Sequence, residues 1–276
     1  MGTATNRKLA VVTGASSGIG FELAKHCVAN DFDLVICAED EGIHQAAVHL
    51  GAAGTSIVPV RADLATYEGV EMLVHAIREM ARPVDALLMN AGVGVGGAFL
   101  LTDLEEEFRM ITLNCSSLIH LSKRVIPGMV SRGEGRVLIT ASIASTAPAP
   151  FLAVYGATKA FDLSFAEALR HELKDTGVTV TALQPGATDT EFFTRAHMEN
   201  TKVAQGKKDD PAEVAKTGFE AMMAGKDSVI AASLKSKLMG LANEVLPETL
   251  KAQQQAKETR PGTGRKPTNP NLRKVE

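Results

Sequence analysis

A glycine-rich loop near the start of the chain, residues 13–20 (TGASSGIG), most constrains its fold. An apolar run, residues 9–12, enters the loop, and apolar residues at helical spacing follow it, so the predicted order is strand, tight turn and helix. Unpaired N–H groups and the helix dipole attract an anion to a helix N-terminus, and glycines let a pyrophosphate approach the backbone closely. The residues predicted to contact this phosphate are Gly14, Ser16, Ser17, Gly18, Ile19 and Gly20.

A second apolar run, residues 34–38, supports the same interpretation because it ends at an acid, Glu39. This acid lies about 20 residues past the loop, where dinucleotide-binding folds place a carboxylate on the adenosine ribose. The alternative is a structural turn with a solvated glutamate. We favour the dinucleotide site because loop, helix, strand and acid follow one another in the required order.

Residues 14–18 (GASSG) also match the G-x-S-x-G turn that carries the nucleophile of serine hydrolases. That turn needs an earlier strand and loop to supply an oxyanion-hole N–H group. The segment before Gly14 is too short to provide them, so we do not expect a serine hydrolase.

Strand-like and helix-like segments alternate along the chain, and the strands are apolar without polar alternation. This pattern predicts an α/β fold of the Rossmann type, a doubly wound parallel sheet flanked by helices on both faces. The predicted strands are residues 11–13, 33–38, 55–60, 84–89, 135–140 and 178–183, with a candidate last strand at 227–231. The predicted helices after the first are residues 67–81, 104–129 with a break near Asn114, 154–174 and 211–223.

Composition sets the class of protein. The 276 residues are 45% hydrophobic and 22% charged, with a net charge of −3, which is typical of a globular protein and does not indicate binding to nucleic acid or a membrane. Three cysteines in apolar segments, with no signal peptide or membrane-length run, indicate a reduced, cytoplasmic protein without a membrane span. No metal site is expected, because His120, His171 and His197 have no clustered partners.

The expected organisation is a single dinucleotide-binding domain, residues 1–250, which includes a substrate loop at 188–210. An apolar stretch at 234–246 is a candidate contributor to the substrate pocket or a subunit contact. The polar, basic residues 251–276 are expected to form a flexible or loosely docked tail.

The second strong feature is Tyr155 followed by Lys159, because the i, i+4 spacing puts both on one helix face. A free tyrosine has a pKa of about 10, and a nearby ammonium lowers it. A tyrosine tuned in this way can donate a proton to a carbonyl oxygen or accept one from an alcohol.

Together these motifs make the sequence resemble a short-chain dehydrogenase/reductase over about residues 7–195. The resemblance rests on the glycine loop, Asp63, residues 90–92 (NAG), Asn114, Ser142, Tyr155 with Lys159, and residues 185–190 (PGATDT), in family order.

The resemblance implies a role for each matching residue. Tyr155 would be the general acid/base, Lys159 would lower its pKa and bind the nicotinamide ribose, Ser142 would hold the substrate oxygen, and Asn114 would hold a water in a proton relay. Two alternatives stay open: Asn114 could only kink its helix, and Ser145 could take the place of Ser142. The further cofactor contacts that the resemblance implies are Glu39, Asp63, Leu64, Asn90, Ala91, Gly92, Tyr155, Lys159, Pro185, Gly186, Thr188 and Thr190.

Two positions depart from the family pattern. Met89 stands where the family often has an asparagine, which we expect to be tolerated. Glu39 can accept a hydrogen bond from a ribose 2′-OH and would repel a 2′-phosphate, and neither Ser17 nor Asp40 offers a cation to bind that phosphate. We therefore predict NAD as the cofactor rather than NADP.

The predicted function is NAD-dependent hydride transfer between the cofactor and an alcohol or ketone. Six apolar residues near the expected site suggest an apolar substrate, although they could merely close the core: Val93, Val95, Ile143, Phe151, Phe192 and Phe193. The alternatives are an NADP-dependent carbonyl reductase and a non-catalytic dinucleotide-binding regulator. The resemblance also implies a homodimer or homotetramer with helices 104–129 and 154–174 at the interfaces.

Overall fold

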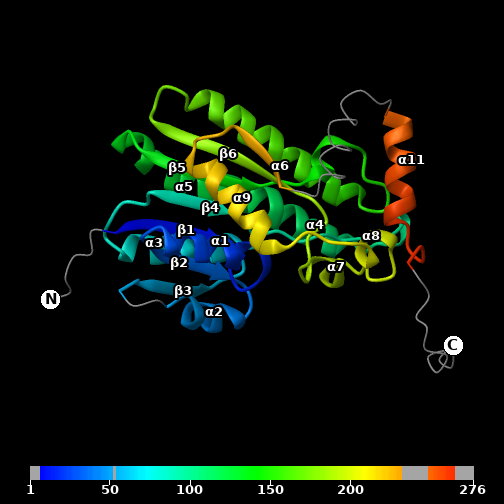
Figure 1. The fold of residues 1–276 in the computed structure, drawn as a ribbon, viewed down its shortest axis with the longest axis horizontal. Helices are drawn as coiled ribbons and strands as arrows, with labels where there is room; N and C mark the ends of the chain where they lie inside the picture. The colour runs from blue at the N-terminus through cyan, green and yellow to red at the C-terminus, as the bar shows by residue number, and fades with distance from the viewer. Residues whose placement is uncertain (1–6, 52–53, 232–247, 265–276) are drawn as a thin grey trace.

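A parallel β-sheet forms the centre of the molecule (Figure 1). The computed structural model describes residues 7–51, 54–231 and 248–264. Within them, seven parallel strands lie in the order β3-β2-β1-β4-β5-β6-β7, which confirms the predicted doubly wound sheet. The strands are β1 (Lys8–Thr13), β2 (Phe32–Ala38), β3 (Ile57–Arg61), β4 (Ala86–Met89), β5 (Gly135–Thr140), β6 (Val178–Pro185) and β7 (Ser228–Ala231).

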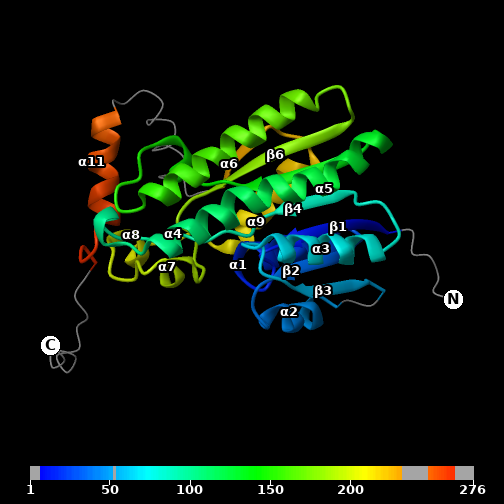
Figure 2. The ribbon, with the colours of Figure 1, turned by 180° about the vertical axis from the view of Figure 1, so that it is seen from behind.

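The strands are uniformly apolar because both faces of the sheet are covered. Successive side chains of a strand point to opposite faces, and in β1 Leu9 and Val11 pack in one core cluster while Ala10 and Val12 pack in another. Helices α1 (Gly18–Ala29), α2 (Gly42–Leu50) and α9 (Pro211–Met223) contribute to the second cluster, on the face seen in Figure 1. Helices α3 (Tyr67–Glu79), α5 (Ser117–Arg132) and α6 (Ala153–Glu172) contribute to the first, seen in Figure 2.

The predicted break near Asn114 is present. Helix α4 (Leu104–Ile111) passes into a π-helical turn, η2 (Thr112–Ser116), and then into α5. The carboxylate of Asp103 caps the start of α4 by accepting hydrogen bonds from the backbone N–H groups of Glu105 and Glu106. A π-bulge inserts one extra residue into a turn and is often found at functional sites. Asn114 lies in this turn and is buried.

Short elements lie beyond the carboxyl ends of the strands: η1 (Phe99–Leu101), η3 (Ile143–Thr146), α7 (Phe192–Arg195) and α8 (Lys202–Gln205). Three of them, η3, α7 and α8, contribute to a third apolar cluster, which includes Val95, Tyr155 and Phe193. This cluster is separate from the sheet cores and lies where an open α/β sheet binds its ligands.

The C-terminal segment, which was expected to form a flexible or loosely docked tail, contains a helix that contacts the rest of the protein. Residues 248–259 form α11 (Glu248–Thr259), and the Thr259 hydroxyl donates to the Pro150 carbonyl at 2.7 Å. The Arg260 guanidinium lies 5.3 Å from the centre of the Phe151 ring. The sequence of α11 is polar and therefore did not predict that this segment contacts the rest of the protein. Residues 265–276 and the apolar stretch 234–246 lie outside the described residues.

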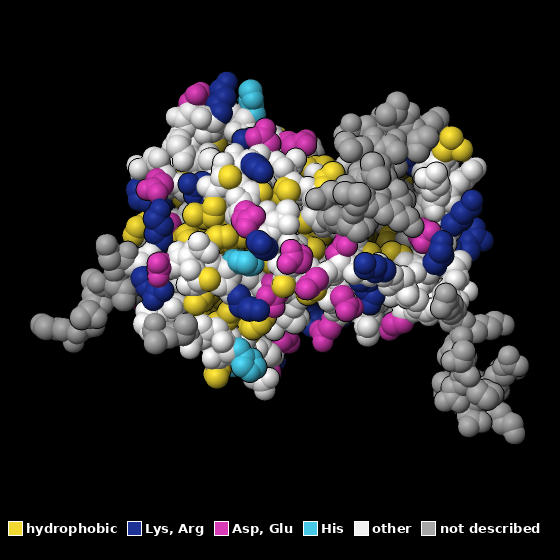
Figure 3. All heavy atoms as spheres, viewed as in Figure 1, with side chains coloured by type: hydrophobic (Ala, Val, Ile, Leu, Met, Phe, Trp, Pro, Cys, Tyr) yellow, Lys and Arg dark blue, Asp and Glu magenta, His cyan; other side chains and the backbone are white. Residues whose placement is uncertain are grey.

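The surface agrees with the modest net charge. On the face in Figure 3, basic and acidic side chains are interspersed. No helix among the described residues is long and apolar enough to cross a membrane.

Candidate active site

The glycine loop has the shape that a bound phosphate requires. Gly14 and Gly18 adopt positive φ angles of 64° and 57°, which disfavour a side chain. A Cβ at Gly14 would also lie 2.9 Å from Ala91 Cα. Helix α1 begins at Gly18, and its N-cap, Ser17, makes no side-chain capping bond, so its first N–H groups can serve an anion. These residues fit the pyrophosphate of a dinucleotide.

The residues predicted for the site gather along the carboxyl edge of the sheet. Asn90 joins three strands there: its backbone N–H donates to Thr13 Oγ1 at 3.0 Å, its Nδ2 to Thr13 O at 3.3 Å, and Thr140 Oγ1 donates to its Oδ1 at 3.1 Å. Met89, which stands where the family often has an asparagine, packs in the sheet core.

Several other predicted cofactor residues make contacts within the protein. The Ala91 backbone N–H donates to Thr13 Oγ1, and Leu64 is buried in the sheet core. The N–H of Gly186, just past β6, donates to Ala231 O. A Cβ at Gly18 would lie 2.9 Å from Thr190 Cγ2, so the segment after β6 lies against the glycine loop.

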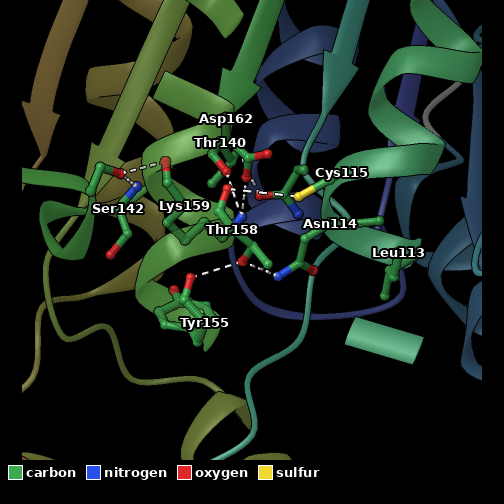
Figure 4. Close-up of polar contacts among 12 residues, drawn as sticks. Leu113, Asn114, Cys115, Thr140, Ser142, Tyr155, Thr158, Lys159 and Asp162 are labelled. Atoms are coloured by element: carbon green, nitrogen blue, oxygen red, sulfur yellow. Dashed lines mark hydrogen bonds and ion pairs between the residues drawn. The ribbon is translucent and has the colours of Figure 1, made fainter. Parts of the chain in front are cut away.

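Tyr155 and Lys159 lie one turn apart on α6, both buried, beside the end of β5 (Figure 4). The Lys159 ammonium donates to Thr140 O at 2.9 Å and to Asp162 Oδ2 at 2.9 Å. A Cβ on Gly92 would lie 3.2 Å from Lys159 Nζ, so this glycine keeps the approach to the ammonium open.

The structure separates the roles of the two candidate serines. Ser145 Oγ donates to the Lys159 carbonyl at 2.8 Å and accepts from the Ser142 backbone N–H at 3.2 Å. It is therefore committed to the backbone. Ser142 Oγ also meets the backbone, since it accepts from the Ala144 N–H at 3.1 Å and caps η3. What distinguishes Ser142 is its influence on Tyr155, because it lowers the pKa of that phenol.

Asn114 is more than a kink residue. Its side-chain Nδ2 donates to Val93 O at 3.0 Å and to Thr158 Oγ1 at 2.9 Å, and its Oδ1 accepts from Val93 N at 3.1 Å. It thereby ties the loop after β4 to α6, one turn from Tyr155. A Cβ on Gly92 would lie 3.2 Å from Asn114 Oδ1 as well as from Lys159 Nζ.

Burial dominates the electrostatics of Tyr155. It raises the pKa of the phenol, and the Lys159 ammonium and the hydrogen bond with Ser142 lower that pKa by less, so the net shift is upward. For Lys159, burial lowers the pKa, but Asp162 and Tyr155 outweigh it and the ammonium is favoured. The predicted influence of Lys159 on Tyr155 is present, although burial exceeds it.

At the opposite end of the site, two predicted carboxylates share one arginine that the sequence interpretation missed. Arg109 on α4 contacts Glu39 Oε2 at 2.6 Å and Asp63 Oδ2 at 2.7 Å. Burial raises the pKa of Asp63, but Arg109 and the Ala65 N–H lower it by more. A cation therefore does lie beside Glu39. It does not come from the neighbouring positions 17 and 40, because Arg109 reaches Glu39 from helix α4.

Some of the apolar residues expected to line the substrate site are buried in the protein core. Val95 and Phe193 are buried in the third apolar cluster, so they close the fold, while Val93 and Phe192 are only half-buried. The Phe192 ring centre lies 5.1 Å from that of Tyr155. A Cβ on Gly94 would lie 2.6 Å from Phe192 Cζ, so only a glycine leaves room for this ring. Phe192 thus lies over the catalytic tyrosine candidate from the segment after β6.

Comparisons with known proteins show the family of the chain. The family model described as short chain dehydrogenase matches residues 8–201. The chain is 36% identical over 187 residues to the glycine betaine reductase ATRR of Emericella nidulans, covering 67% of this chain and 15% of that protein. It is 30% identical over 186 residues to the ketoacyl reductase HetN of Nostoc sp., covering 67% and 64%. The chain thus spans less than two thirds of the length of either relative.

A solved structure gives the same result for the fold. A short-chain dehydrogenase from Sphingobium yanoikuyae in complex with NADPH matches with a TM-score of 0.75 and 29% identity, covering 86% of this chain and 93% of that one.

Proposed function

The chain belongs to the short-chain dehydrogenase family, and we propose that it is an NAD(P)-dependent oxidoreductase in which Tyr155 exchanges the proton in a reaction with an alcohol or a ketone. The observation that carries this proposal is the position of Tyr155, which is buried one turn from Lys159 on α6, at the carboxyl edge of the sheet where the glycine loop also lies. A binding-only protein has no need for that arrangement.

The cofactor, when bound, supplies or accepts the hydride. The residues of the chain bind and orient the substrate and transfer the proton. Ser142 holds the substrate oxygen and stabilises charge that develops on it. In reduction, the Tyr155 hydroxyl donates its proton to that oxygen; in oxidation, the phenolate accepts it. Lys159 favours the phenolate and offers its remaining N–H to the ribose, and Asn114 supports the proton path through the loop after β4.

The cofactor that we propose is NAD, with Glu39 accepting a hydrogen bond from the ribose 2′-OH. A second candidate is NADPH, which is favoured by a specific contact: Arg109, a cation that would attract a 2′-phosphate, pairs with Glu39 and Asp63 at this end of the site. The complex of the Sphingobium enzyme with NADPH agrees with this second candidate.

A titration of NADH against NADPH decides between them, with the isosteric Glu39→Gln variant measured beside the wild type. We expect NADH to bind at least tenfold more tightly, a difference of about 1.4 kcal/mol, and the variant to lose most of that preference. Equal or tighter binding of NADPH would contradict the role of Glu39. Turnover of a panel of alcohols and ketones with each cofactor tests the reaction itself.

The substrate that we propose is an apolar ketone or alcohol. Phe192 and Val93 remain half-buried beside Tyr155, and both offer apolar surface to a bound molecule. Activity that rises with the apolar size of the ketone, and falls in Phe192→Ala, would support this class. A preference for charged or polyhydroxylated carbonyls would contradict it.

We also propose a homo-oligomer. Among the described residues, α4, α5 and α6 carry exposed apolar side chains: Leu104 is 58%, Phe108 55%, Ile119 39% and Phe161 38% exposed. Burying these side chains against a second copy would be favourable. A monomer in light scattering at micromolar concentration would refute this proposal.

A further inference from the structure

The acid beside Lys159 has no role in the site described so far. Asp162 follows Lys159 by three residues, so both project from the same side of α6. Their side chains are 3% and 6% exposed, and Lys159 Nζ lies 2.9 Å from Asp162 Oδ2. Burying a carboxylate is costly unless a partner compensates, and here the partner is the ammonium that acts on Tyr155.

The arrangement places Asp162 and Tyr155 in different directions from Lys159. Lys159 uses two donors on Thr140 O and Asp162, and in Figure 4 these partners lie at the top of the cluster while Tyr155 lies at the bottom. Asp162 Oδ1 has no protein hydrogen-bond partner. Asp162 also lines a small cavity with the polar side chains of Asn114 and Ser117. Such a cavity can hold water that solvates a carboxylate.

Few charges act on Tyr155. The titratable groups that influence it or its neighbours are Lys159 and Asp162 on α6 and Cys115 on η2. Burial is the main reason why the pKa of the Cys115 thiol rises to about 11, so this thiol is neutral at physiological pH. Burial raises the pKa of the Asp162 carboxyl, and Lys159 lowers it by less. The charges that act on the phenol are therefore the Lys159 ammonium and, when ionised, the Asp162 carboxylate.

We propose that Asp162 is a positioning residue that pairs with Lys159, offsets the ammonium charge, and so holds Tyr155 in its protonated, proton-donating form. The proposal rests on the assignment of Tyr155 as the proton donor. In reduction the carbonyl carbon gains the hydride, the carbonyl oxygen gains the Tyr155 proton, and the phenolate recovers a proton from solvent. Asp162 then sets the pH range of this step, extending proton donation toward alkaline pH.

The composition of the chain allows a direct test without substrate or cofactor. The chain has two tyrosines and no tryptophan, so Tyr67→Phe leaves Tyr155 as the only source of tyrosinate absorbance. In this background Asp162→Asn should lower the titration midpoint of Tyr155 by at least about one pH unit, because the ammonium is no longer offset. Glu167→Gln, which removes an exposed charge from the same helix, is the matched control and should leave the midpoint unchanged.

An unchanged or higher midpoint in Asp162→Asn would overturn the proposal; a higher one would mean that Asp162 serves mainly to keep Lys159 charged. Asp162→Leu removes the same charge and serves if the asparagine variant does not fold. The parent Tyr67→Phe protein gives an independent reading, since its Tyr155 should titrate above the ordinary value of about 10. A midpoint well below that value would also overturn the proposal.

This titration is separable from the proposed function. If no alcohol or ketone of the panel is turned over with either cofactor, the proposed reaction fails while the midpoints still report on Asp162. If turnover occurs, the alkaline limit of ketone reduction in Asp162→Asn should move to lower pH by the same amount as the midpoint, and the limit in Glu167→Gln should not move.

Discussion

The two ends of the candidate site hold their charges differently. At the catalytic end, Lys159 and Asp162 form an ion pair whose side chains are 6% and 3% exposed. At the adenosine end, Arg109 joins Glu39 and Asp63, and these side chains are 46%, 41% and 36% exposed. Distances in the two clusters are similar, so the difference lies in the surroundings rather than in the contact geometry.

This difference predicts which end is fixed and which is adjustable. Solvent and salt screen exposed charges, and an exposed ion pair is worth about 0–1 kcal/mol, so Arg109 can change partners when a ligand arrives. A buried pair is screened much less, and removing one member leaves an uncompensated charge. Substitutions at the catalytic end should therefore act on the chemistry, and those at the adenosine end on the choice of cofactor.

The largest effect is expected for Lys159→Met. Without the ammonium, burial of Asp162 is no longer offset, so its carboxyl is favoured in the protonated form, and the phenolate of Tyr155 loses the support of the Lys159 charge. We expect kcat/KM for ketone reduction or alcohol oxidation to fall by at least about 100-fold, within the range of general acid–base effects. The exposed Lys174→Met is the control and should retain activity. A loss of less than tenfold in Lys159→Met would mean that burial alone sets the behaviour of Tyr155.

The next effect is the dependence of rate on pH. The pKa of Tyr155 is raised, first by burial, so the protonated donor persists through neutral pH. Ketone reduction should stay constant there and fall, by about tenfold per pH unit, only once the pH rises through the pKa of Tyr155. Alcohol oxidation needs the phenolate and should rise over the same interval. A reduction rate that already declines between pH 6 and about 8 would contradict this assignment.

A smaller effect is expected at the adenosine end. Arg109→Met frees the carboxylates of Glu39 and Asp63, so NADH should bind equally well or up to about tenfold more tightly, whereas NADPH should bind more weakly. Isothermal titration of both dinucleotides measures this, with Arg124→Met, an exposed arginine of α5 paired with Glu71, as the control for charge. Weaker binding of NADH in Arg109→Met would show that the arginine supports the dinucleotide directly.

The smallest effect is on stability. Arg109→Met should lower the free energy of unfolding by no more than about 1 kcal/mol, since its ion pairs are exposed. Arg109 is the main group that lowers the pKa of Asp63, although burial opposes it. A lowered folded-state pKa stabilises above the unfolded value, so this contribution is present at neutral pH and is lost as the pH falls through the pKa of folded Asp63. Urea unfolding of wild type and Arg109→Met at neutral and acidic pH measures this contribution. A larger difference in unfolding free energy at acidic than at neutral pH would contradict the predicted pH dependence.

Most of the fold could be predicted because the relevant signals are local. Apolar runs predicted every strand of the sheet, and the glycines of residues 14–20 predicted the turn before α1. Asn114 was expected at a helix break, and the π-helical turn lies there. Helix α2 and helix α11 were missed, since the first is short and the second is polar and docks through contacts such as the one between Thr259 and Pro150.

The charge partners of the site could be predicted less well. Arg109 is distant in sequence from Glu39 and Asp63 and carries no motif, so only the folded chain brings them together. Asp162 did leave a signal: an acid three residues after Lys159 on a predicted helix is within reach of the ammonium. Its burial, which gives the pair its effect, depends on the packing of η2 and β5 and could not be inferred from spacing.

The most direct test of the account compares the Tyr155→Phe variant with wild type in two measurements on the same sample. The first is NADH binding; the second is oxidation of bound NADH by an accepted ketone in a single turnover. We predict that Tyr155→Phe binds NADH within about threefold of wild type but oxidises it at least about 100-fold more slowly, because the proton donor is lost and the cofactor contacts remain. A rate in Tyr155→Phe close to that of wild type would contradict the assignment of Tyr155 as the group that transfers the proton.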